Sequence, residues 1–169
     1  LNHPWESCLT MGQGWAYSPD DHYKPARGLI HTLVDIVAKG GNMLLNIGPS
    51  PEGRFDATAL QRLAEIGDWM EVNGEAIHGT RPVAPYKEGH VCFTRKNDAV
   101  FAIILADAGA HTPPPELRLG ALQPRDGSPV TALGRTGDLR WRREGDVAVV
   151  ALPADMFPGD HAWVVRFGI

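Results

Sequence analysis

The stretch that decides the fold is Lys39-Gly40-Gly41-Asn42-Met43-Leu44-Leu45-Asn46-Ile47-Gly48-Pro49. Its centre, residues 43–47, is a nearly unbroken apolar run between a Gly-Gly pair and a Gly-Pro pair. A short apolar run between such breakers predicts a β-strand buried on both faces, as in a parallel sheet covered by helices. Asn46 is the polar exception. It lies at the carboxyl end of the predicted strand, which is the end where α/β folds bind ligands.

Helical patterns lie on both sides of this strand. Pro25 opens the first helix, whose apolar stripe continues through Ala38, and Gly40-Gly41 supplies a left-handed stop. Asp56 is the expected N-cap of a second helix that runs to about Val72. We expect the inward face of this helix to consist of Leu60, Leu63, Ile66, Gly67, Trp69 and Met70. The order of loop, helix, buried strand, loop and helix is typical of an α/β domain.

Residues 1–24 show no clean helical or strand periodicity and are rich in aromatic and turn-forming residues. They predict a long ordered loop with a short strand near residues 5–9. Long structured loops in compact domains often carry function.

After about residue 80 the pattern changes to short segments with β-branched or aromatic residues, separated by turn signals. Several short strands at close spacing favour an antiparallel β-sandwich. We place the boundary near residues 80–85, so that an α/β segment, residues 1–80, precedes a sandwich domain, residues 85–169. The predicted strands are 91–94, 100–105, 117–119, 130–133, 139–141, 147–152 and 163–167.

The α/β segment is too short to close a sheet by itself, because a complete (β/α)8 barrel takes roughly 250 residues. We therefore expect residues 1–80 to be the tail of a larger domain of the (β/α)8-like TIM barrel kind. The chain begins at Leu1 without an initiating Met or a leader pattern, so we expect its beginning to be missing. Any targeting signal would be missing with it, and the compartment stays open.

Composition and charge narrow the possible partners. The chain has 169 residues, of which 43% are hydrophobic and 21% charged, as in ordinary globular domains. The net charge is −4 and no Lys/Arg-rich run occurs, which disfavours nucleic acid and anionic membranes as partners. No apolar stretch approaches the roughly 20 residues that span a bilayer. The two cysteines, Cys8 and Cys92, are expected to be free thiols, and the oligomeric state is left open.

Two patterns near the start of the chain suggest chemistry. In the first, the indole of Trp5 precedes the carboxylate of Glu6, and apolar surroundings can raise the pKa of such a carboxyl enough for it to act as a general acid. The alternative is a Glu in a structural hydrogen-bond network or in solvent. In the second, Trp15 and Tyr17 lie in the long loop, where aromatic rings can stack on sugars. The alternative is that they pack on the surface of their own domain.

Other kinds of site find little support in the sequence. The Gly40-Gly41-Asn42 run precedes a strand, whereas phosphate-binding glycines follow one, and residues 48–53 lack the Lys and glycine spacing of a P-loop. The seven histidines show no metal-ligand spacing, and no Gly-x-Ser-x-Gly elbow occurs. We therefore expect no metal and no other cofactor.

Several motifs, in order and at matching spacing over residues 3–95, resemble the α-L-fucosidases of glycoside hydrolase family 29. They are Trp5-Glu6-Ser7-Cys8-Leu9-Thr10, Gly14-Trp15-Ala16-Tyr17, Lys39 to Pro49, Gly53, and Val72-Asn73-Gly74-Glu75-Ala76-Ile77-His78-Gly79-Thr80-Arg81-Pro82. The resemblance implies a retaining glycosidase that removes terminal α-L-fucose through a covalent intermediate, in a barrel followed by a β-sandwich. It also implies a fucosylated glycan as substrate and a secreted, periplasmic or lysosomal setting.

The resemblance carries roles to a few positions in this chain. Trp15 corresponds to the aromatic residue that packs against the methyl side of fucose, although Gly-Trp-Ala-Tyr here replaces the more common Trp-Gly-Tyr. Glu6 corresponds to the Glu of the family's Trp-Glu pair and is our candidate for the acid/base residue. Trp5 and Asn46 are candidate substrate-binding or site-ordering residues. The nucleophilic Asp and the histidines that bind fucose are expected upstream of Leu1.

Two rival functions follow from the same residues. One is a non-catalytic carbohydrate-binding module in which the sandwich is the functional unit. Such modules usually expose a row of aromatics, whereas strand alternation is expected to bury most of those in residues 96–169. The other rival is a barrel glycosidase with a different sugar specificity.

Overall fold

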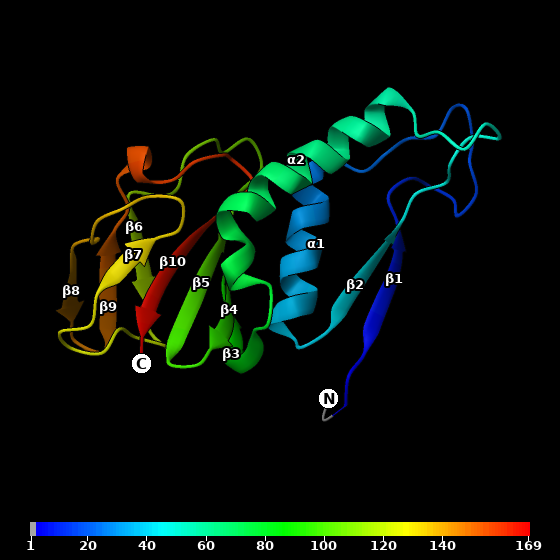
Figure 1. Ribbon diagram of the computed structural model, residues 1–169. Helices are drawn as coiled ribbons and strands as arrows, with labels where there is room; N and C mark the ends of the chain where they lie inside the picture. The colour runs from blue at the N-terminus through cyan, green and yellow to red at the C-terminus, as the bar shows by residue number, and fades with distance from the viewer. Residues whose placement is uncertain (1–2) are drawn as a thin grey trace.

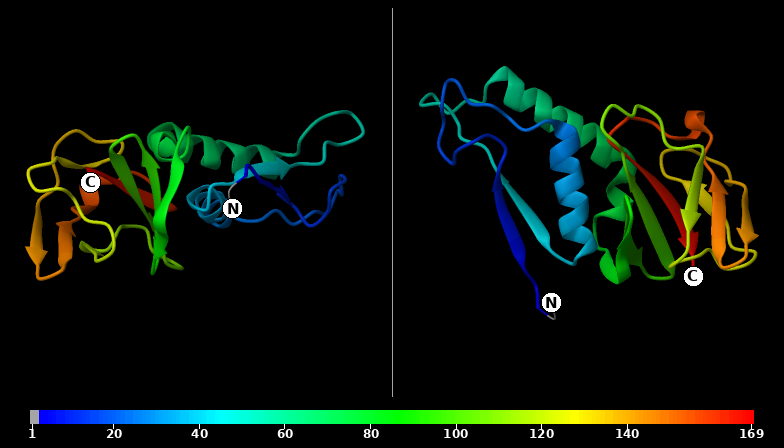
Figure 2. Two further views of the ribbon diagram at one scale, coloured as in Figure 1. Left: turned by 90° about the horizontal axis from the view of Figure 1, so that it is seen from below. Right: turned by 180° about the vertical axis from the view of Figure 1, so that it is seen from behind.

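The computed structural model describes residues 3–169, so the first two residues of the predicted segment 1–80 lie outside the described part. Two parts lie side by side (Figures 1 and 2). One is an α/β part, and the other is a β part that contains the antiparallel strands. The α/β part contains β1 (Glu6–Thr10), α1 (Ala26–Ala38), β2 (Asn42–Asn46), α2 (Ala57–Asn73) and a short 3-10 helix (Gly74–Ala76). Neither α-helix of the described part combines the length and apolar character that crossing a membrane requires.

The ends of the helices follow the local signals in the sequence. Pro25 is the N-cap of α1, and Gly40, with φ of 84°, turns the chain out of this helix in the left-handed region that favours glycine. The Asp56 carboxylate accepts a hydrogen bond of 2.8 Å from the backbone N–H of Ala59, which caps α2. These boundaries confirm the predicted helices to within one residue.

The decisive stretch forms the parallel strand β2, but β2 is not buried on both faces as predicted. It pairs with β1 in register from Glu6–Asn42 to Thr10–Asn46. Met43 and Leu45 are partly covered, whereas Leu44 is 45% exposed and its partner Cys8 is also exposed. Helix α1 packs against β2, and none of the described residues covers the Leu44 face. Because α1 covers only one face of β2, covered and exposed residues alternate from Asn42 to Leu45.

The predicted inward face of α2 is also partly wrong. Leu60 is 54% exposed and Leu63 is 37% exposed, while Ala59 and Trp69 are buried. The first turns of α2 extend beyond the antiparallel strands, and the last turns pack on them (Figure 1). Near its start, Ala59 packs with Met11 and Leu29, whereas Leu60 and Leu63 remain exposed among residues 3–169.

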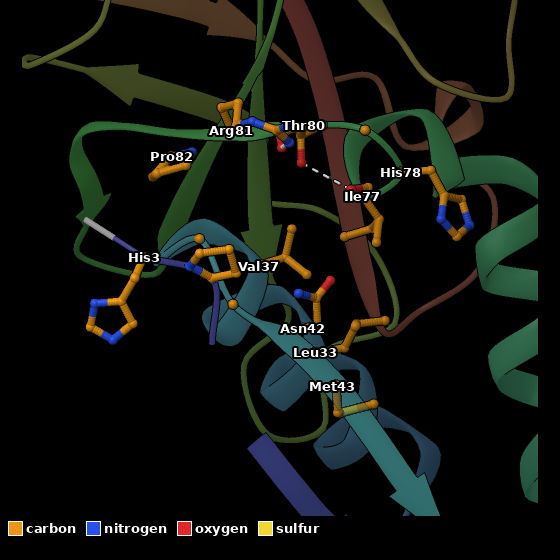
Figure 3. Close-up of a pocket in the computed structure, with 14 residues that line it drawn as sticks. His3, Leu33, Val37, Asn42, Met43, Ile77, His78, Thr80, Arg81 and Pro82 are labelled. Atoms are coloured by element: carbon orange, nitrogen blue, oxygen red, sulfur yellow. Dashed lines mark hydrogen bonds between the residues drawn. The ribbon is translucent and has the colours of Figure 1, made fainter. Parts of the chain in front are cut away.

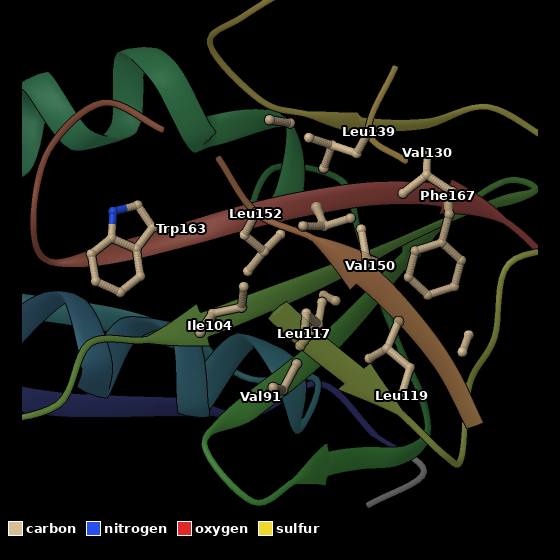
Figure 4. Close-up of a cluster of buried hydrophobic side chains, with 14 of the residues drawn as sticks. Val91, Ile104, Leu117, Leu119, Val130, Leu139, Val150, Leu152, Trp163 and Phe167 are labelled. Atoms are coloured by element: carbon tan, nitrogen blue, oxygen red, sulfur yellow. The ribbon is translucent and has the colours of Figure 1, made fainter. Parts of the chain in front are cut away.

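The β part consists of two antiparallel sheets packed face to face, consistent with the expected β-sandwich. Their strand orders are β3-β4-β5-β10-β7 and β6-β9-β8. Apolar side chains from both sheets fill the space between them, among them Leu119, Val150 and Phe167 (Figure 4). The strands are β3 (Arg81–Glu88), β4 (Val91–Lys96), β5 (Ala99–Leu105), β6 (Glu116–Leu119), β7 (Val130–Ala132), β8 (Trp141–Glu144), β9 (Val147–Ala151) and β10 (Ala162–Gly168).

Strand β3 is absent from the sequence-based prediction because it contains Pro82 and Pro85. It lies at the edge of its sheet, where a missing N–H is tolerated, and its register shifts between Pro82 and Lys87. The strand predicted at residues 139–141 instead begins at Trp141. The division into domains at residues 80–85 stays a prediction.

The central strands of the five-stranded sheet, β4, β5 and β10, are buried on both faces. Along β5, Val100, Ala102 and Ile104 point into the sandwich. The alternate residues Phe101 and Ile103 pack in a second cluster that includes side chains of α1 and α2, among them Ile30, Val34 and Trp69. The pattern predicted for residues 43–47 thus occurs in β5, because helices cover one face of this sheet and a second sheet covers the other.

This packing predicts a large cost for removing Phe101, which is fully buried beneath the helices. The substitution Phe101→Ala should lower the free energy of unfolding by about 3–5 kcal/mol, since it deletes buried apolar surface and leaves a cavity. Chemical denaturation monitored by circular dichroism would measure this. The exposed Phe55→Ala is the matched control, and an equal loss in both variants would contradict the double burial of the sheet.

Candidate functional site

The carboxyl ends of β1 and β2 form one edge from which two loops leave. The rim loop is residues 11–24, and the second loop is residues 47–56. The backbone N–H of Met11 donates to the carbonyl of Asn46 over 2.9 Å, which joins the strand ends. The side-chain Oδ1 of Asn46 is buried and accepts no hydrogen bond from any residue of the described part. A buried acceptor without a donor is costly, and residues 3–169 supply no donor to this oxygen.

Lys24 ties the end of the rim loop to its beginning. Its Nζ donates to the carbonyl oxygens of Thr10, over 2.6 Å, and Gly12, over 2.9 Å. Its backbone N–H donates to the carbonyl of Met11 over 2.9 Å. Within the loop, the Asp21 carboxylate accepts from the backbone N–H of Gln13 over 2.8 Å. A segment without helix or strand structure is thereby closed into a defined shape.

The rim loop crosses the second loop in close contact at Gly48. A Cβ atom on Gly48 would lie 2.5 Å from the backbone nitrogen of Tyr17, so only glycine fits here. Trp15 and Tyr17 stay on the surface, with exposed fractions of 59% and 37%. The crossing therefore presents aromatic rings at the edge where Asn46 lies.

Tyr23 attaches the rim loop to α2. Its hydroxyl donates to the Asp56 carboxylate over 2.7 Å, and this bond, together with burial and the nearby negative charge, raises the pKa of Tyr23 to about 12. The Asp56 carboxyl has a lowered pKa, first because the Ala59 N–H stabilises its charge and second because Tyr23 does. The N-cap of α2 and the rim loop share one carboxylate.

Glu6 and Trp5 lie at the other end of the strands. Glu6 is the first residue of β1, and Thr10 at the rim lies four positions further along, a distance of about 13 Å in extended backbone. The Glu6 side chain is exposed, with Cys8 Sγ 3.7 Å from its Oε1. The Trp5 ring lies against Gly41, where a Cβ atom would be 2.5 Å from it. The structure thus places Trp15 and Asn46 at one edge, and Glu6 and Trp5 at the opposite one.

A cavity of about 710 Å³ also lies at the amino ends of the strands. Its lining includes His3, Asn42, Met43, His78 and Arg81 (Figure 3). Neither Trp15 nor Asn46 lines it, so this hollow is separate from the rim.

Sequence reasoning found the rim aromatics but missed the residues that hold them. Lys24, Asp21 and the Tyr23–Asp56 pair are single polar residues whose partners lie up to 33 positions away. The periodicity of apolar residues along the sequence does not predict hydrogen bonds between distant polar residues. The Gly48-Pro49 pair did mark a turn, and its close approach to Tyr17 appears only in three dimensions.

The Tyr23–Asp56 bond predicts that the Tyr23 hydroxyl ionises at a higher pH than an ordinary tyrosine does. Because the folded pKa of Tyr23 is raised above its ordinary value of 10, the stabilisation is complete below pH 10 and is lost as the pH rises through about 12. Tyr23→Phe should lower the free energy of unfolding by about 1 kcal/mol at neutral pH. Near-ultraviolet titration should show one tyrosine fewer ionising near pH 12 in the variant. Identical titration curves would contradict the bond.

The close approach at Gly48 predicts that Gly48→Ala displaces the rim loop. Inserting a methyl group into a tight contact typically costs about 1–3 kcal/mol. Hydrogen exchange of residues 11–24 should accelerate in this variant. Gly67→Ala is the control, because nothing lies within 4 Å of the added atom. Unchanged exchange in Gly48→Ala would show that the crossing does not hold the loop.

Comparison with known proteins identifies the family. A family model described as alpha-L-fucosidase matches residues 1–75. An alpha-L-fucosidase of Branchiostoma floridae is 33% identical over 97% of this chain and 38% of its own length. The tissue alpha-L-fucosidase of Homo sapiens is 32% identical over 98% of this chain and 37% of its own length. The chain therefore spans less than two fifths of these relatives, and it aligns with their C-terminal part.

Solved structures give the same result. Alpha-L-fucosidase isoenzyme 1 from Paenibacillus thiaminolyticus superposes with a TM-score of 0.82 at 29% identity, covering 98% of this chain and 39% of that protein. The Thermotoga maritima alpha-fucosidase in complex with fucose has a TM-score of 0.84 at 26% identity, covering 100% of this chain and 40% of that protein. By sequence and by fold, this chain belongs to the α-L-fucosidases of glycoside hydrolase family 29 and corresponds to their C-terminal part.

Proposed function

We propose that this chain is the C-terminal part of a retaining α-L-fucosidase, in which residues 1–80 complete a (β/α)8-like barrel and residues 85–169 form the sandwich. The observation that carries the barrel assignment is the parallel β1–β2 pair, with α1 packed on one face and a bare second face. Barrel strands bury the second face inside the barrel, where side chains from neighbouring strands meet. Cys8 and Leu44 would lie there.

The complete enzyme would hydrolyse terminal α-L-fucosyl linkages of glycans in two steps. In retaining enzymes, two carboxyl groups about 5–5.5 Å apart act as nucleophile and as acid/base, and a covalent glycosyl-enzyme forms between the steps. One family 29 relative from Bacteroides thetaiotaomicron is described as a trapped covalent intermediate. The Asp nucleophile would come from the part of the enzyme that precedes residue 1.

The rim would supply substrate contacts. The exposed ring of Trp15 offers an apolar face to the methyl side of fucose, and the buried Oδ1 of Asn46 can accept a hydrogen bond from the sugar or from a neighbouring barrel residue. Trp5, packed on Gly41 at the far end, would act on the site only by supporting the strands. In this proposal, residues of this chain bind the sugar, and residues outside it cleave the glycosidic bond.

We do not assign proton transfer to Glu6. A general acid must come within hydrogen-bond reach of the glycosidic oxygen. Glu6 begins β1 at the end opposite the rim, about 13 Å away along the strand. An upstream carboxyl group fits the acid/base role better.

The rival of a sugar-binding sandwich has little support. Phe101, Phe157, Trp163 and Phe167 are all buried. Trp141 is half-buried, with the guanidinium of Arg143 5.6 Å from its ring centroid. No row of exposed aromatics therefore occurs on the strands of residues 96–169.

The test is hydrolysis of an aryl α-L-fucoside. The protein that carries this chain behind a complete barrel should turn over the substrate, whereas the 169-residue chain alone should not. In the longer protein, Trp15→Ala should raise KM about tenfold, equivalent to roughly 1.4 kcal/mol of binding, and Trp141→Ala should leave it unchanged. Turnover by the 169-residue chain, or preference of the longer protein for another aryl glycoside, would refute the proposal.

A further inference from the structure

Arg27, in the first turn of α1, reaches across to the sandwich. Its Nη1 donates to the carbonyl of Asp107 over 2.7 Å. Its Nη2 donates to the carbonyls of Ala110, over 2.6 Å, and Asp160, over 2.8 Å, and lies 3.5 Å from the Asp160 carboxylate. Two separate sandwich segments, one after β5 and one before β10, thus converge on one guanidinium. A planar group with five fixed donors suits such a junction, and a lysine ammonium does not.

Two further side chains of the helices extend this contact along the same segment. His31 Nε2 lies 2.7 Å from the carbonyl of His161, and Trp69 Nε1 donates to the carbonyl of Ala162 over 2.9 Å. Burial lowers the pKa of His31, which favours a neutral ring, and a carbonyl can only accept, so Nε2 carries the proton. Three successive carbonyls, residues 160–162, are therefore bound by side chains from α1 and α2.

Arg27 is also three residues from Lys24, which closes the rim loop. Lys24 binds the carbonyls of Thr10 and Gly12, and Gly12 lies three residues before Trp15. Pro25, between Lys24 and α1, has its φ fixed at −65° by its ring. A shift of the first turn of α1 would consequently move Lys24 and the start of the rim loop.

We propose that Arg27 is a positioning residue: through it, the sandwich fixes the first turn of α1 and thereby the rim loop that carries Trp15. The consequence for sugar binding rests on the proposed function, but the mechanical link does not. Arg27 itself touches no substrate. It makes the sandwich a part of the site's scaffold rather than an appendage.

The link is tested on the 169-residue chain by hydrogen exchange of a peptide spanning residues 11–24, whose protected amides include Met11, Gln13 and Lys24. Arg27→Ala should accelerate this exchange about tenfold. Arg27→Lys, which retains the charge and cannot bind all three carbonyls, should give a smaller increase and serves if the Ala variant fails to fold. Arg62→Ala is the matched control, because the guanidinium of Arg62 binds Glu65 within α2. Faster exchange only at residues 105–112 and 157–162 would overturn the proposal and leave Arg27 as a docking contact.

The second readout is the kinetics of the longer protein on an aryl α-L-fucoside. Arg27→Ala should raise KM about fivefold and leave kcat within twofold, because Trp15 is displaced while the catalytic carboxyl groups are not. A lower melting temperature with unchanged KM would indicate a purely structural role and refute the positioning. If the wild-type longer protein shows no turnover, the proposed function fails, and the exchange experiment still decides the link.

Discussion

The burial of the central strands β4, β5 and β10 on both faces is the constraint on which the rest of the structure depends. Phe101 and Ile103 of β5 pack against the helices, while the residues between them pack into the sandwich. A strand with no polar face must be covered twice, and here α1 and α2 provide the second cover. The sandwich is therefore one side of a shared core, which explains why its aromatic residues are buried rather than displayed.

That shared core gives the rim its firm base. The rim loop lacks helix and strand structure, but hydrogen bonds hold it. Lys24 bonds to Thr10 at the end of β1. Tyr23 bonds to Asp56 at the N-cap of α2, and Asp21 accepts a bond from within the loop. A well-anchored loop can keep Trp15 in solvent without letting the chain around it move freely. Such preorganisation reduces the entropy that a ligand must offset on binding. Under the proposed function, the exposed ring of Trp15 would benefit from this preorganisation when fucose binds.

The sequence predicted the elements whose signals are local. Pro25, Gly40 and Asp56 act on adjacent backbone and mark their helix ends correctly. Burial could not be predicted in the same way, because Leu44 and Leu60 are apolar whether or not another element covers them. Strand β3 was missed because its prolines resemble a linker. For the site, the expectation that ligands bind at the carboxyl ends of parallel strands led to Asn46. The strand predicted near residues 5–9 forms as β1, with Glu6 at its first position, and the role of Glu6 stays a prediction.

The bare face of β1 and β2 differs from a surface adapted to water. Cys8 and Leu44 are paired across it, and Asn46, two residues further along the same face, keeps a buried oxygen without a partner. A strand face that met solvent would carry charged or hydroxyl groups in place of the Cys8–Leu44 pair, as this face does at Thr10. At the amino end, by contrast, Glu6 and Asn42 are exposed polar residues that need no cover. Along this face, exposed polar residues thus lie at the amino end, the apolar Cys8–Leu44 pair lies at the centre, and the buried oxygen of Asn46 without a hydrogen bond lies at the carboxyl end. Neighbouring strands would cover its apolar centre, and a ligand or a donor from those strands would satisfy Asn46.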